Sequence, residues 1–300
     1  MAQQVNHRTL APLVLGLTLL APVANASEGL LGYTKGAEPL PEGALEFYQT
    51  FVQRSDKGAG YYEATDFITE LEYGVSNRFS ASISLFGHSI DTHGLHIDGY
   101  LPQDKNITQL SGFEVSAAYA FLTPALDDIG LSTSVTLEYD TIDKHSGQDK
   151  DTLSVILGLQ LQKYFLDGQM VWLGNFDMET THANRSAITG INDQDVWPTE
   201  PEMEIALGVS TGLSYRFAPN WSMGIEAVYE EEHETEVGLE RWSLFAGPSI
   251  HYGGKKFWST LTYLPQISGG GETYPSQADT DLHLIEKTKQ EIKFTIGYNF

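Results

Sequence analysis

Apolar residues recur at every second position in twelve stretches of the chain, with mostly polar residues between them. The clearest stretch is 79–85, in which four apolar residues alternate with three serines. A period of two is that of a β-strand with one apolar and one polar face, and a shift of one residue would exchange the faces. The pattern predicts twelve strands: 45–51, 66–73, 79–85, 112–121, 131–140, 153–162, 170–178, 202–217, 221–230, 244–252, 257–264 and 291–300.

The intervals between these strands alternate in length. Those after even-numbered strands are short, such as 76–78 and 218–220, whereas those after odd-numbered strands tend to be longer, such as 88–109 and 180–201. Transmembrane β-barrels sort their connections in this way, with short periplasmic turns at one end and longer extracellular loops at the other. A soluble β-sandwich, which is the alternative, has no reason to do so. We therefore predict an all-β fold, a transmembrane antiparallel barrel of about twelve strands.

Aromatic residues gather near the ends of the predicted strands, most of them at the end with the short turns. Aromatic side chains favour the interfaces between a membrane and water. We expect the following residues to form such a girdle: Phe79, Tyr119, Phe121, Tyr215, Phe217, Trp221, Trp242, Tyr252, Trp258, Tyr298 and Phe300.

The first 26 residues have the three parts of a secretory signal peptide. Arg8 precedes an apolar run at 10–20, and Ala24 and Ala26 form a small-x-small cleavage site. The apolar run is shorter than the ~20 residues that a transmembrane helix needs, which argues against an uncleaved anchor.

The sequence beyond the signal peptide divides into a short segment and one domain. Residues 27–42 contain several glycines, two prolines and mixed charge, and we predict that they form a periplasmic lead-in. Residues 43–300 hold all twelve predicted strands and form the barrel, a normal size for one β domain.

The last predicted strand, 291–300, carries five apolar residues on one face and polar residues such as Lys293 on the other. This pattern resembles the C-terminal β-signal of Gram-negative outer-membrane barrels, with its terminal phenylalanine. The resemblance implies residence in the outer membrane, among lipid and lipopolysaccharide. It also implies the barrel-assembly machinery and periplasmic chaperones as partners. The β-signal residues, which we expect to face lipid, are Ile292, Phe294, Ile296, Tyr298 and Phe300.

Segments 34–46, 70–79 and 257–266 together resemble an uncharacterised family of outer-membrane barrels from proteobacteria. The chain is also distantly similar to barrels associated with meta-pathway degradation of aromatic compounds. Both resemblances imply the architecture, and neither carries a catalytic motif to this sequence.

Composition restricts the partners. Forty acidic residues against seventeen basic ones give a formal net charge of −23, which makes nucleic acid an improbable partner because phosphate binding needs the opposite sign. The chain contains no cysteine, so disulfides and thiolate chemistry are excluded. A hydrophobic fraction of 41% resembles that of a soluble protein, because barrel strands expose only alternate residues to lipid.

The predicted inward faces carry many carboxylates and few bases, of which Lys293 and Arg216 are the visible ones. Buried carboxylates without partners are costly, whereas an aqueous lumen solvates them. We therefore expect an acidic, water-filled lumen. The inward acidic residues are Glu70, Glu72, Glu114, Glu138, Asp140, Glu202, Glu204, Glu226 and Glu291.

A passive channel or uptake port for small solutes is the function that these features favour, with no cofactor and no catalytic residue assigned. Two alternatives stay open. One is an enzyme that modifies lipid or lipopolysaccharide at the rim, and the other is a structural or adhesive surface protein that uses its loops.

Three histidines, His88, His93 and His96, lie in the predicted loop after the third strand, near Asp91 and Asp98. Such residues are the weak candidates for a divalent metal or for rim catalysis, although no recognised motif is present. An acidic run at 230–236 is a second place where divalent cations could be shared with lipopolysaccharide.

Overall fold

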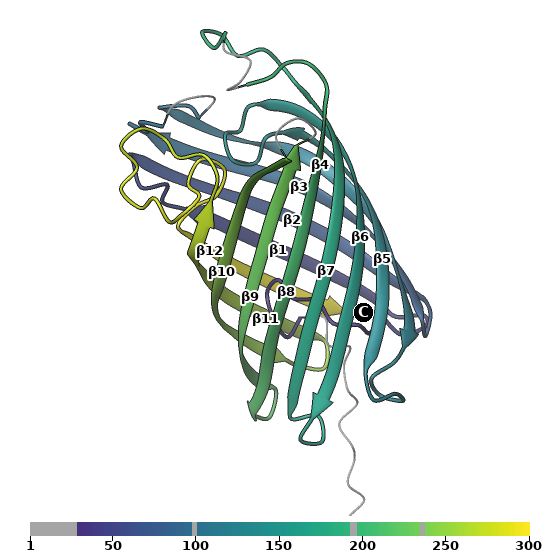
Figure 1. The fold of residues 1–300 in the computed structure, drawn as a ribbon. Coiled ribbons are helices and arrows are strands. Elements are labelled where there is room, and N and C mark those ends of the chain that lie inside the picture. Colours follow the sequence, from purple (N-terminus) through teal and green to yellow (C-terminus); the bar gives the residue numbers. More distant parts are fainter. Residues whose placement is uncertain (1–28, 98–100, 193–196, 235–237) are drawn as a thin grey trace, which may run out of the picture.

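The computed structural model describes residues 29–97, 101–192, 197–234 and 238–300, so the predicted signal peptide and its cleavage residues Ala24 and Ala26 lie outside the described residues. The chain forms one closed antiparallel barrel, as Figure 1 shows. Each strand pairs with its neighbours in sequence, and β1 pairs with β12 to close the cylinder. The strands are β1 (Leu45–Ser55), β2 (Tyr61–Ser76), β3 (Phe79–His93), β4 (Lys105–Leu122), β5 (Gly130–Ile142), β6 (Asp149–Phe165), β7 (Met170–Arg185), β8 (Glu202–Ala218), β9 (Trp221–Glu234), β10 (Gly238–Gly253), β11 (Phe257–Gly270) and β12 (Gln290–Asn299).

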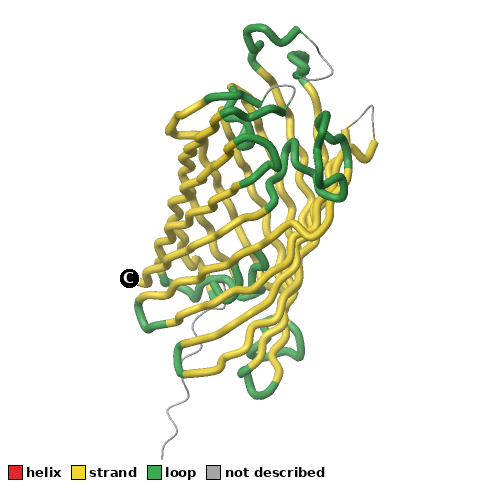
Figure 2. Tube along the Cα trace, turned by 90° about the vertical axis from the view of Figure 1, so that its left-hand side faces the viewer, coloured by secondary structure: helices red, strands yellow, loops and turns green. Residues whose placement is uncertain are grey.

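The prediction of a twelve-stranded all-β barrel is confirmed. Among the described residues, no helix is long and apolar enough to cross a membrane. The connections after even-numbered strands are short and meet at one end, which we name the turn end. The other connections meet at the opposite end, which we name the loop end; Figure 2 shows both.

Strand β12 closes the barrel with its apolar face outward. Phe294 lies opposite Phe51 of β1, and the backbone amide of Phe300 donates to the carbonyl of Leu45 at 3.1 Å. The side chain of Phe300 is 70% exposed on the outer surface, and Ile292 and Tyr298 lie on the same face. These positions place Ile292, Tyr298 and Phe300 of the predicted β-signal on the outer surface of the barrel.

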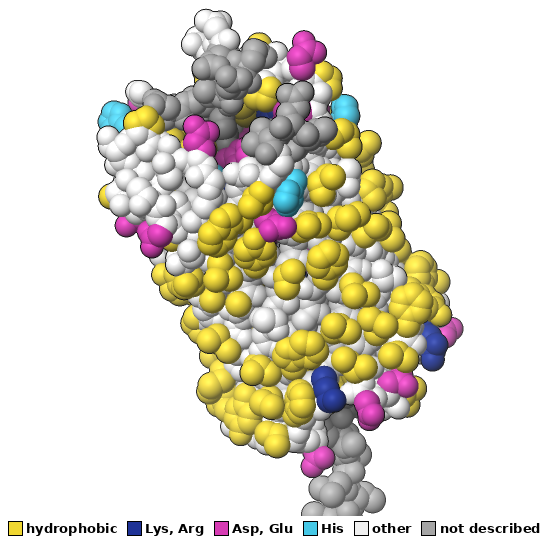
Figure 3. All heavy atoms as spheres, in the orientation of Figure 1, with side chains coloured by type: hydrophobic (Ala, Val, Ile, Leu, Met, Phe, Trp, Pro, Cys, Tyr) yellow, Lys and Arg dark blue, Asp and Glu magenta, His cyan; other side chains and the backbone are white. Residues whose placement is uncertain are grey.

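A band of apolar side chains covers the outer surface, and on the face drawn in Figure 3 the charged groups lie above and below it. Ile83, Leu137 and Ile225 are each more than half exposed, which suits a hydrocarbon solvent. Trp258 is an exception to the predicted girdle. Its indole donates a hydrogen bond to Glu46 inside the barrel, because β11 turns Phe257, not Trp258, outward.

Several strands extend further toward the loop end than the hydrophobic pattern predicts. Strand β3 continues to His93 and β4 starts at Lys105, so the connection is 94–104, not 88–109. Above the lipid, the outward face no longer needs apolar residues. The alternation of apolar residues therefore ends at that level, while the backbone hydrogen bonds between the strands continue beyond it.

The segment before β1 lies inside the barrel, whereas the sequence suggested a lead-in outside it. Leu31, Ala37 and Leu40 are each at most 3% exposed, although they belong to no strand. The segment enters at the turn end and runs along the lumen wall, as Figure 1 and Figure 2 show. We name residues 29–42 the plug segment.

The connections at the loop end pack together into an apolar cluster. It joins side chains of the loops at 94–104, 186–201 and 271–289 to the inward faces of β2 and β3. We name these loops the cap. The buried members of the cluster are Tyr62, Ala64, Ile90, Leu95, Ile97, Leu101, Trp197, Tyr274 and Leu284.

Candidate functional site: a lumen closed at both ends

The plug segment is held by one carboxylate on the lumen wall. Glu226 of β9 is 2% exposed and accepts hydrogen bonds from the backbone amides of Gly32 at 2.7 Å, Tyr33 at 3.0 Å and Thr34 at 3.0 Å. Hydrogen bonds to an ionised carboxylate are among the stronger ones in proteins. Successive amides that point at one anion form a concave nest, so Glu226 fixes the local backbone of the segment.

Further along, wall amides bind the backbone of the plug segment. Asn175 of β7 accepts from the Lys35 amide at 2.6 Å and donates to the Lys35 carbonyl at 2.9 Å. Gln162 of β6 accepts from the Ala37 amide at 2.9 Å. These side chains satisfy backbone N–H and C=O groups that a neighbouring strand would otherwise satisfy. The segment can therefore be buried without regular secondary structure.

The wall also provides space for an apolar anchor. Leu31 packs against Val171 and Leu173, and a Cβ atom on either Gly212 or Gly224 would lie 2.4 Å from its methyl groups. Glycines in a strand often mark the close approach of another backbone or side chain. Here they open a recess for Leu31.

Three of the predicted lumen carboxylates contact the plug segment or lie near it. Glu226 binds its backbone, and Glu291 accepts from the Tyr33 hydroxyl at 2.6 Å. Glu70 lines the cavity that lies beside the segment, together with Lys35. Glu226 and Glu291 thus bind a segment that the sequence predicts to lie outside the barrel, and Glu70 lies beside it.

Except for Glu114, the remaining predicted carboxylates have partners on the wall. Glu72 accepts from the Tyr48 hydroxyl at 2.9 Å. The other inward pairs join a carboxylate to a lysine or arginine near the loop end: Lys144 with Glu138 and Asp140, Lys150 with Glu204, and Arg185 with Glu202 and Glu204. Glu114 lies two residues after Gly112 on the inward face of β4.

The expectation of few inward bases is wrong. Arg216, one of the two bases expected there, is exposed at the turn end, while Lys144, Lys150 and Arg185 lie inside. Sequence reasoning missed them because they sit in or beside the extended strand ends, where the hydrophobic period had stopped. If the inward and outward alternation is continued beyond the apolar residues of β6 and β7, it assigns Lys150 and Arg185 to the lumen.

A buried charge cluster joins the first three strands. Arg54 of β1 donates to Asp66 of β2 at 2.6 Å, and Nδ1 of His88 on β3 lies 2.7 Å from the other Asp66 oxygen. The three residues are each at most 8% exposed. Removing one member of a buried pair leaves an uncompensated charge.

We expect Arg54→Met to lower the free energy of unfolding by about 3–5 kcal/mol, because Asp66 then keeps only His88. The double variant Arg54→Met/Asp66→Leu should regain most of this loss, because it removes both charges. Denaturant unfolding in detergent, followed by the heat-induced shift in gel mobility, gives the two values. Equal stability of Arg54→Met and the wild type would contradict this role.

The cap is tied to the barrel by a buried lysine. Lys57, in the connection between β1 and β2, is 1% exposed. Its ammonium donates to the carbonyls of Ile285 at 2.7 Å, Lys287 at 2.9 Å and Leu284 at 3.4 Å. Burial lowers the pKa of Lys57 to about 7, against the opposing effect of nearby carboxylates. One side chain thus satisfies three backbone acceptors of the last loop.

Two histidines make the loop end sensitive to acid: His283 in the cap, and His145 in the connection at 143–148 between β5 and β6. Burial lowers the pKa of His145 well below its ordinary value, and the nearby cations Lys57 and Arg54 lower it further. Burial also lowers the pKa of His283. A histidine whose pKa is lowered by burial binds fewer protons in the folded loop than in the exposed one. Protonation therefore favours the exposed loop, and the folded loop loses stability as the pH falls below the ordinary histidine pKa of ~6.5.

We therefore expect the cap to loosen between about pH 6.5 and pH 5. Amide hydrogen exchange in residues 143–148 and 271–289, corrected for the intrinsic effect of pH, should become faster across this range. His145→Gln should reduce the pH dependence in 143–148. A corrected exchange rate that is flat from pH 7 to pH 5 would exclude the effect.

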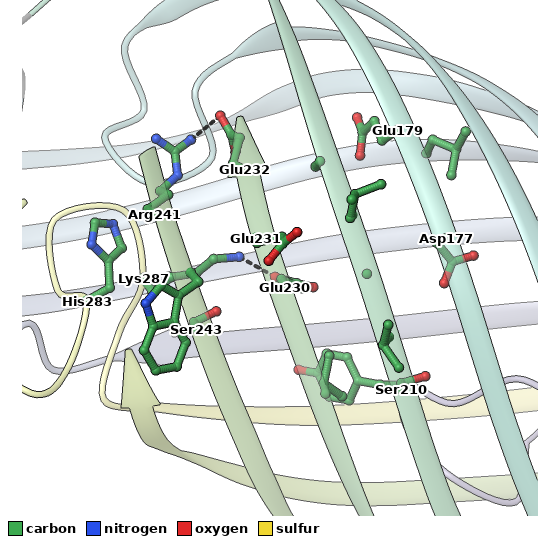
Figure 4. Close-up of a pocket in the computed structure, with 18 of the residues that line it drawn as sticks. Asp177, Glu179, Ser210, Glu230, Glu231, Glu232, Arg241, Ser243, His283 and Lys287 are labelled. Atoms are coloured by element: carbon green, nitrogen blue, oxygen red, sulfur yellow. Dashed lines mark hydrogen bonds and ion pairs between the residues drawn. The ribbon is translucent and has the colours of Figure 1, made fainter. Parts of the chain in front are cut away.

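A cavity of about 440 Å³ lies in the lumen between the plug segment and the cap. Tyr33 of the plug segment borders it on one side, and His283 and Lys287 of the cap border it on another. Figure 4 shows its wall on β7 to β10, with Asp177 on one side and Ser243 on the other. Its volume falls within the ~300–1,000 Å³ range of small-ligand sites.

The histidine candidates do not come together. His88 is buried in the lumen beside Asp66, whereas His93 is exposed and pairs with Asp91 at 3.0 Å. His96 is exposed in the following loop, and Asp98 lies outside the described residues. The predicted loop is partly strand, and alternation sends its side chains to opposite faces. Among the described residues, no group of three His, Cys, Asp or Glu side chains could hold a metal ion.

Alternation also divides the acidic run at 230–236. Glu230 binds Lys287 in the lumen, whereas Glu231 accepts from the Tyr229 hydroxyl at 2.6 Å. Glu232 pairs with Arg241 at 2.5 Å. Residues 235–237 lie outside the described residues. Among the described members, Glu230 and Glu232 share the lumen face but each pairs with a cation, whereas Glu231 lies on the opposite face. The run therefore offers no converging carboxylates for a shared divalent cation.

The fold is that of an outer-membrane β-barrel. Residues 23–300 match the model of DUF6662, a family of unknown function, and the chain belongs to this family. An outer-membrane channel from Pseudomonas putida F1 aligns with a TM-score of 0.58 and 12% identity over 88% of this chain and 98% of its own. The β domain of the Bordetella autotransporter BrkA aligns with a TM-score of 0.50 and 16% identity over 86% of this chain and 100% of its own. A comparison with curated proteins gives no match.

Proposed function

We propose that this protein is a passive channel of the outer membrane for small solutes, and that its plug segment closes it at rest. The cavity of about 440 Å³ inside the lumen is the observation that carries the proposal. A barrel that served only as an anchor would have no need of a polar chamber between a plug and a cap. No catalytic residue is assigned, and the barrel is not proposed to be an enzyme.

The proposal includes the location and orientation of the barrel. The signal peptide would be cleaved after Ala26, and the turn end would face the periplasm, as in barrels with short periplasmic turns. The cap would then face the outside, next to lipopolysaccharide. This orientation places the plug segment on the periplasmic side of the cavity and the cap on the external side.

The contacts of the plug segment suit a gate. It is held mainly by hydrogen bonds to Glu226, Asn175 and Gln162. Its buried apolar side chains are Leu31, Ala37 and Leu40. Net stabilisation by a hydrogen bond is only ~0.5–1.5 kcal/mol, because water replaces the lost partner. The segment can therefore leave the lumen without unfolding the barrel, whose strand ladder is independent of it.

The lumen charge favours cations. Asp177 and Glu179 line the cavity with no basic partner in contact among the described residues, in addition to the paired acidic side chains. Low-dielectric walls strengthen the field of such carboxylates, and this raises the local concentration of positive solutes. We propose a cation-leaning channel, with small solutes as its partners.

Planar-bilayer recording of the purified chain tests the proposal. We expect single-channel steps in KCl, with a reversal potential under a salt gradient that shows preference for K⁺. Correctly folded protein that inserts and yet gives no steps, in the wild type and after removal of the plug segment, would refute the channel.

A further inference from the structure

Asp177 stands in a recess of the cavity wall. Its neighbours in the sheet are Gly158 on β6 and Gly208 on β8, so neither adjacent strand covers it with a side chain. Within the described part of the chain, neither a hydrogen-bond donor nor a cation is in contact with its carboxylate, although Lys35 acts on it from further away. Asp177 thus faces the cavity as an acceptor that the protein itself does not use.

The acidic wall is paired on β9 but not on β7. Glu230 lies across Gly208 from Asp177 and binds Lys287 of the cap. Glu232 lies one step further along β9 and binds Arg241 at 2.5 Å. Glu179, next to Asp177 on the same face, accepts from Thr181 at 3.0 Å and from no other group in the described ranges. Among the described lumen-facing carboxylates that line this cavity, those without a bound cation are therefore the two on β7.

Two buried polar atoms on the other side of the cavity also lack partners. Ser243 is fully buried, and its hydroxyl has no hydrogen bond within the described residues. Nδ1 of His283, a residue 3% exposed, has none either. Both residues line the cavity, and Figure 4 shows them across from Asp177 and Glu179. A buried polar group without a partner is costly, so a ligand that bonds with it gains affinity.

A metal ion does not suit this wall. No group of three metal-ligating His, Cys, Asp or Glu side chains converges anywhere in the described parts of the chain. Asp177 and Glu179 are two positions apart on one strand, which separates their backbones by ~7 Å. Carboxylates at this spacing suit two separate positive groups, or one extended organic cation with hydrogen bonds at its far end.

We propose that the cavity binds a small organic ammonium ion with its positive groups at Asp177 and Glu179, and that Ser243 is placed to bond with a polar substituent where the ion carries one. The inference names the solute class of the proposed channel and rests on that function for the way in which the solute enters. An ammonium group has three donors and no acceptor, which matches a recess of carboxylate and hydroxyl oxygens.

Titration calorimetry on the full chain in detergent tests the site with three probes of one length. These are 1,4-diaminobutane, 1-aminobutane and 1,4-butanediol, with two, one and no positive charges at neutral pH. We expect affinity to fall in that order. Asp177→Asn should weaken binding of the diamine by about tenfold or more, because a hydrogen bond to a charged group is lost. Asp151→Asn is the matched control, since this carboxylate lies on the outer face and accepts from Tyr139.

Three results would overturn the proposal: no binding of the diamine to the wild type, equal affinity for the diamine and the diol, or equal losses in Asp177→Asn and Asp151→Asn. Melting curves of both variants show whether each barrel is folded. Conductance in KCl of the same preparations is recorded separately. Steps without diamine binding would reject the ammonium site alone, whereas absence of steps in wild-type and plug-deleted protein would reject the channel.

Discussion

Deleting residues 29–38 should raise the single-channel conductance several-fold and turn brief openings into a steady open state. The segment fills the lumen near the turn end with buried side chains such as Leu31 and Thr34. Its removal should clear the turn end of the lumen, while the ladder from β1 to β12 stays complete. Recording in planar bilayers at one voltage, before and after deletion, gives the ratio directly.

A point variant separates an effect on opening of the channel from an effect of the deletion on folding of the barrel. Glu226→Gln keeps the shape of the side chain but removes the charge that binds three successive amides. We expect a larger open probability with unchanged conductance of the open state. Glu63→Gln, on the outer face beside Tyr61, is the matched control and should behave as the wild type. Equal conductance with and without residues 29–38 would show that the path does not pass the plug segment.

Lys57→Met should release the last loop of the cap. The ammonium of Lys57 satisfies the carbonyls of Leu284, Ile285 and Lys287, and methionine fills the same space without a donor. A buried acceptor left without a partner costs ~1–3 kcal/mol, so we expect proteolysis within residues 271–289 to become at least about tenfold faster. Limited proteolysis followed by mass spectrometry locates the cleavage.

Lys289→Met is the control for this variant. Lys289 belongs to the same loop and pairs with Asp279 at 2.7 Å, but its side chain is 30% exposed. Exposed ion pairs contribute little, so cleavage should change by less than about threefold. If Lys57→Met were no more sensitive than Lys289→Met, the buried lysine would not hold the cap.

The period-two pattern predicted the barrel because lipid imposes it. In the strands that cross the membrane, most outward residues are apolar, and the pattern is unbroken from Phe79 to Leu85 in β3 and from Ile292 to Tyr298 in β12. The short turns could be predicted as well, because they lie at the edge of the apolar band. The period-two pattern and the short turns both arise because each strand crosses the same apolar layer. Each can therefore be recognised within a short stretch of sequence.

The plug segment and the cap could not be predicted in this way. Contacts such as Gly32 with Glu226 or Lys57 with Ile285 join residues that are about 200 positions apart. These contacts leave no periodic pattern in the sequence, because the buried side chains of an irregular segment do not recur at a fixed spacing. The composition of residues 27–42 excluded a strand, and nothing in it indicated that the walls would supply hydrogen-bond partners.

Asp177 shows the same limit on a smaller scale. The alternation of β7 assigns it to the lumen, yet its role depends on Gly158, Gly208 and a cap loop that approaches from the far end of the chain. It was absent from the predicted inward carboxylates because the apolar pattern of β7 is weak. Alternation in the sequence can predict which side chains face the lumen. Which of those carboxylates have no partner can be seen only in the folded structure.

A reversible lock on the plug segment tests the central claim most directly. A Cβ atom at Gly32 would lie 2.7 Å from Cβ of Thr262, so a Gly32→Cys/Thr262→Cys disulfide needs an outward shift of about 1 Å. The chain has no cysteine of its own to interfere. With the disulfide formed, we predict that conductance steps disappear, and that reduction in the same bilayer restores them. Equal conductance in the oxidised and reduced states would contradict a channel that opens by release of this segment.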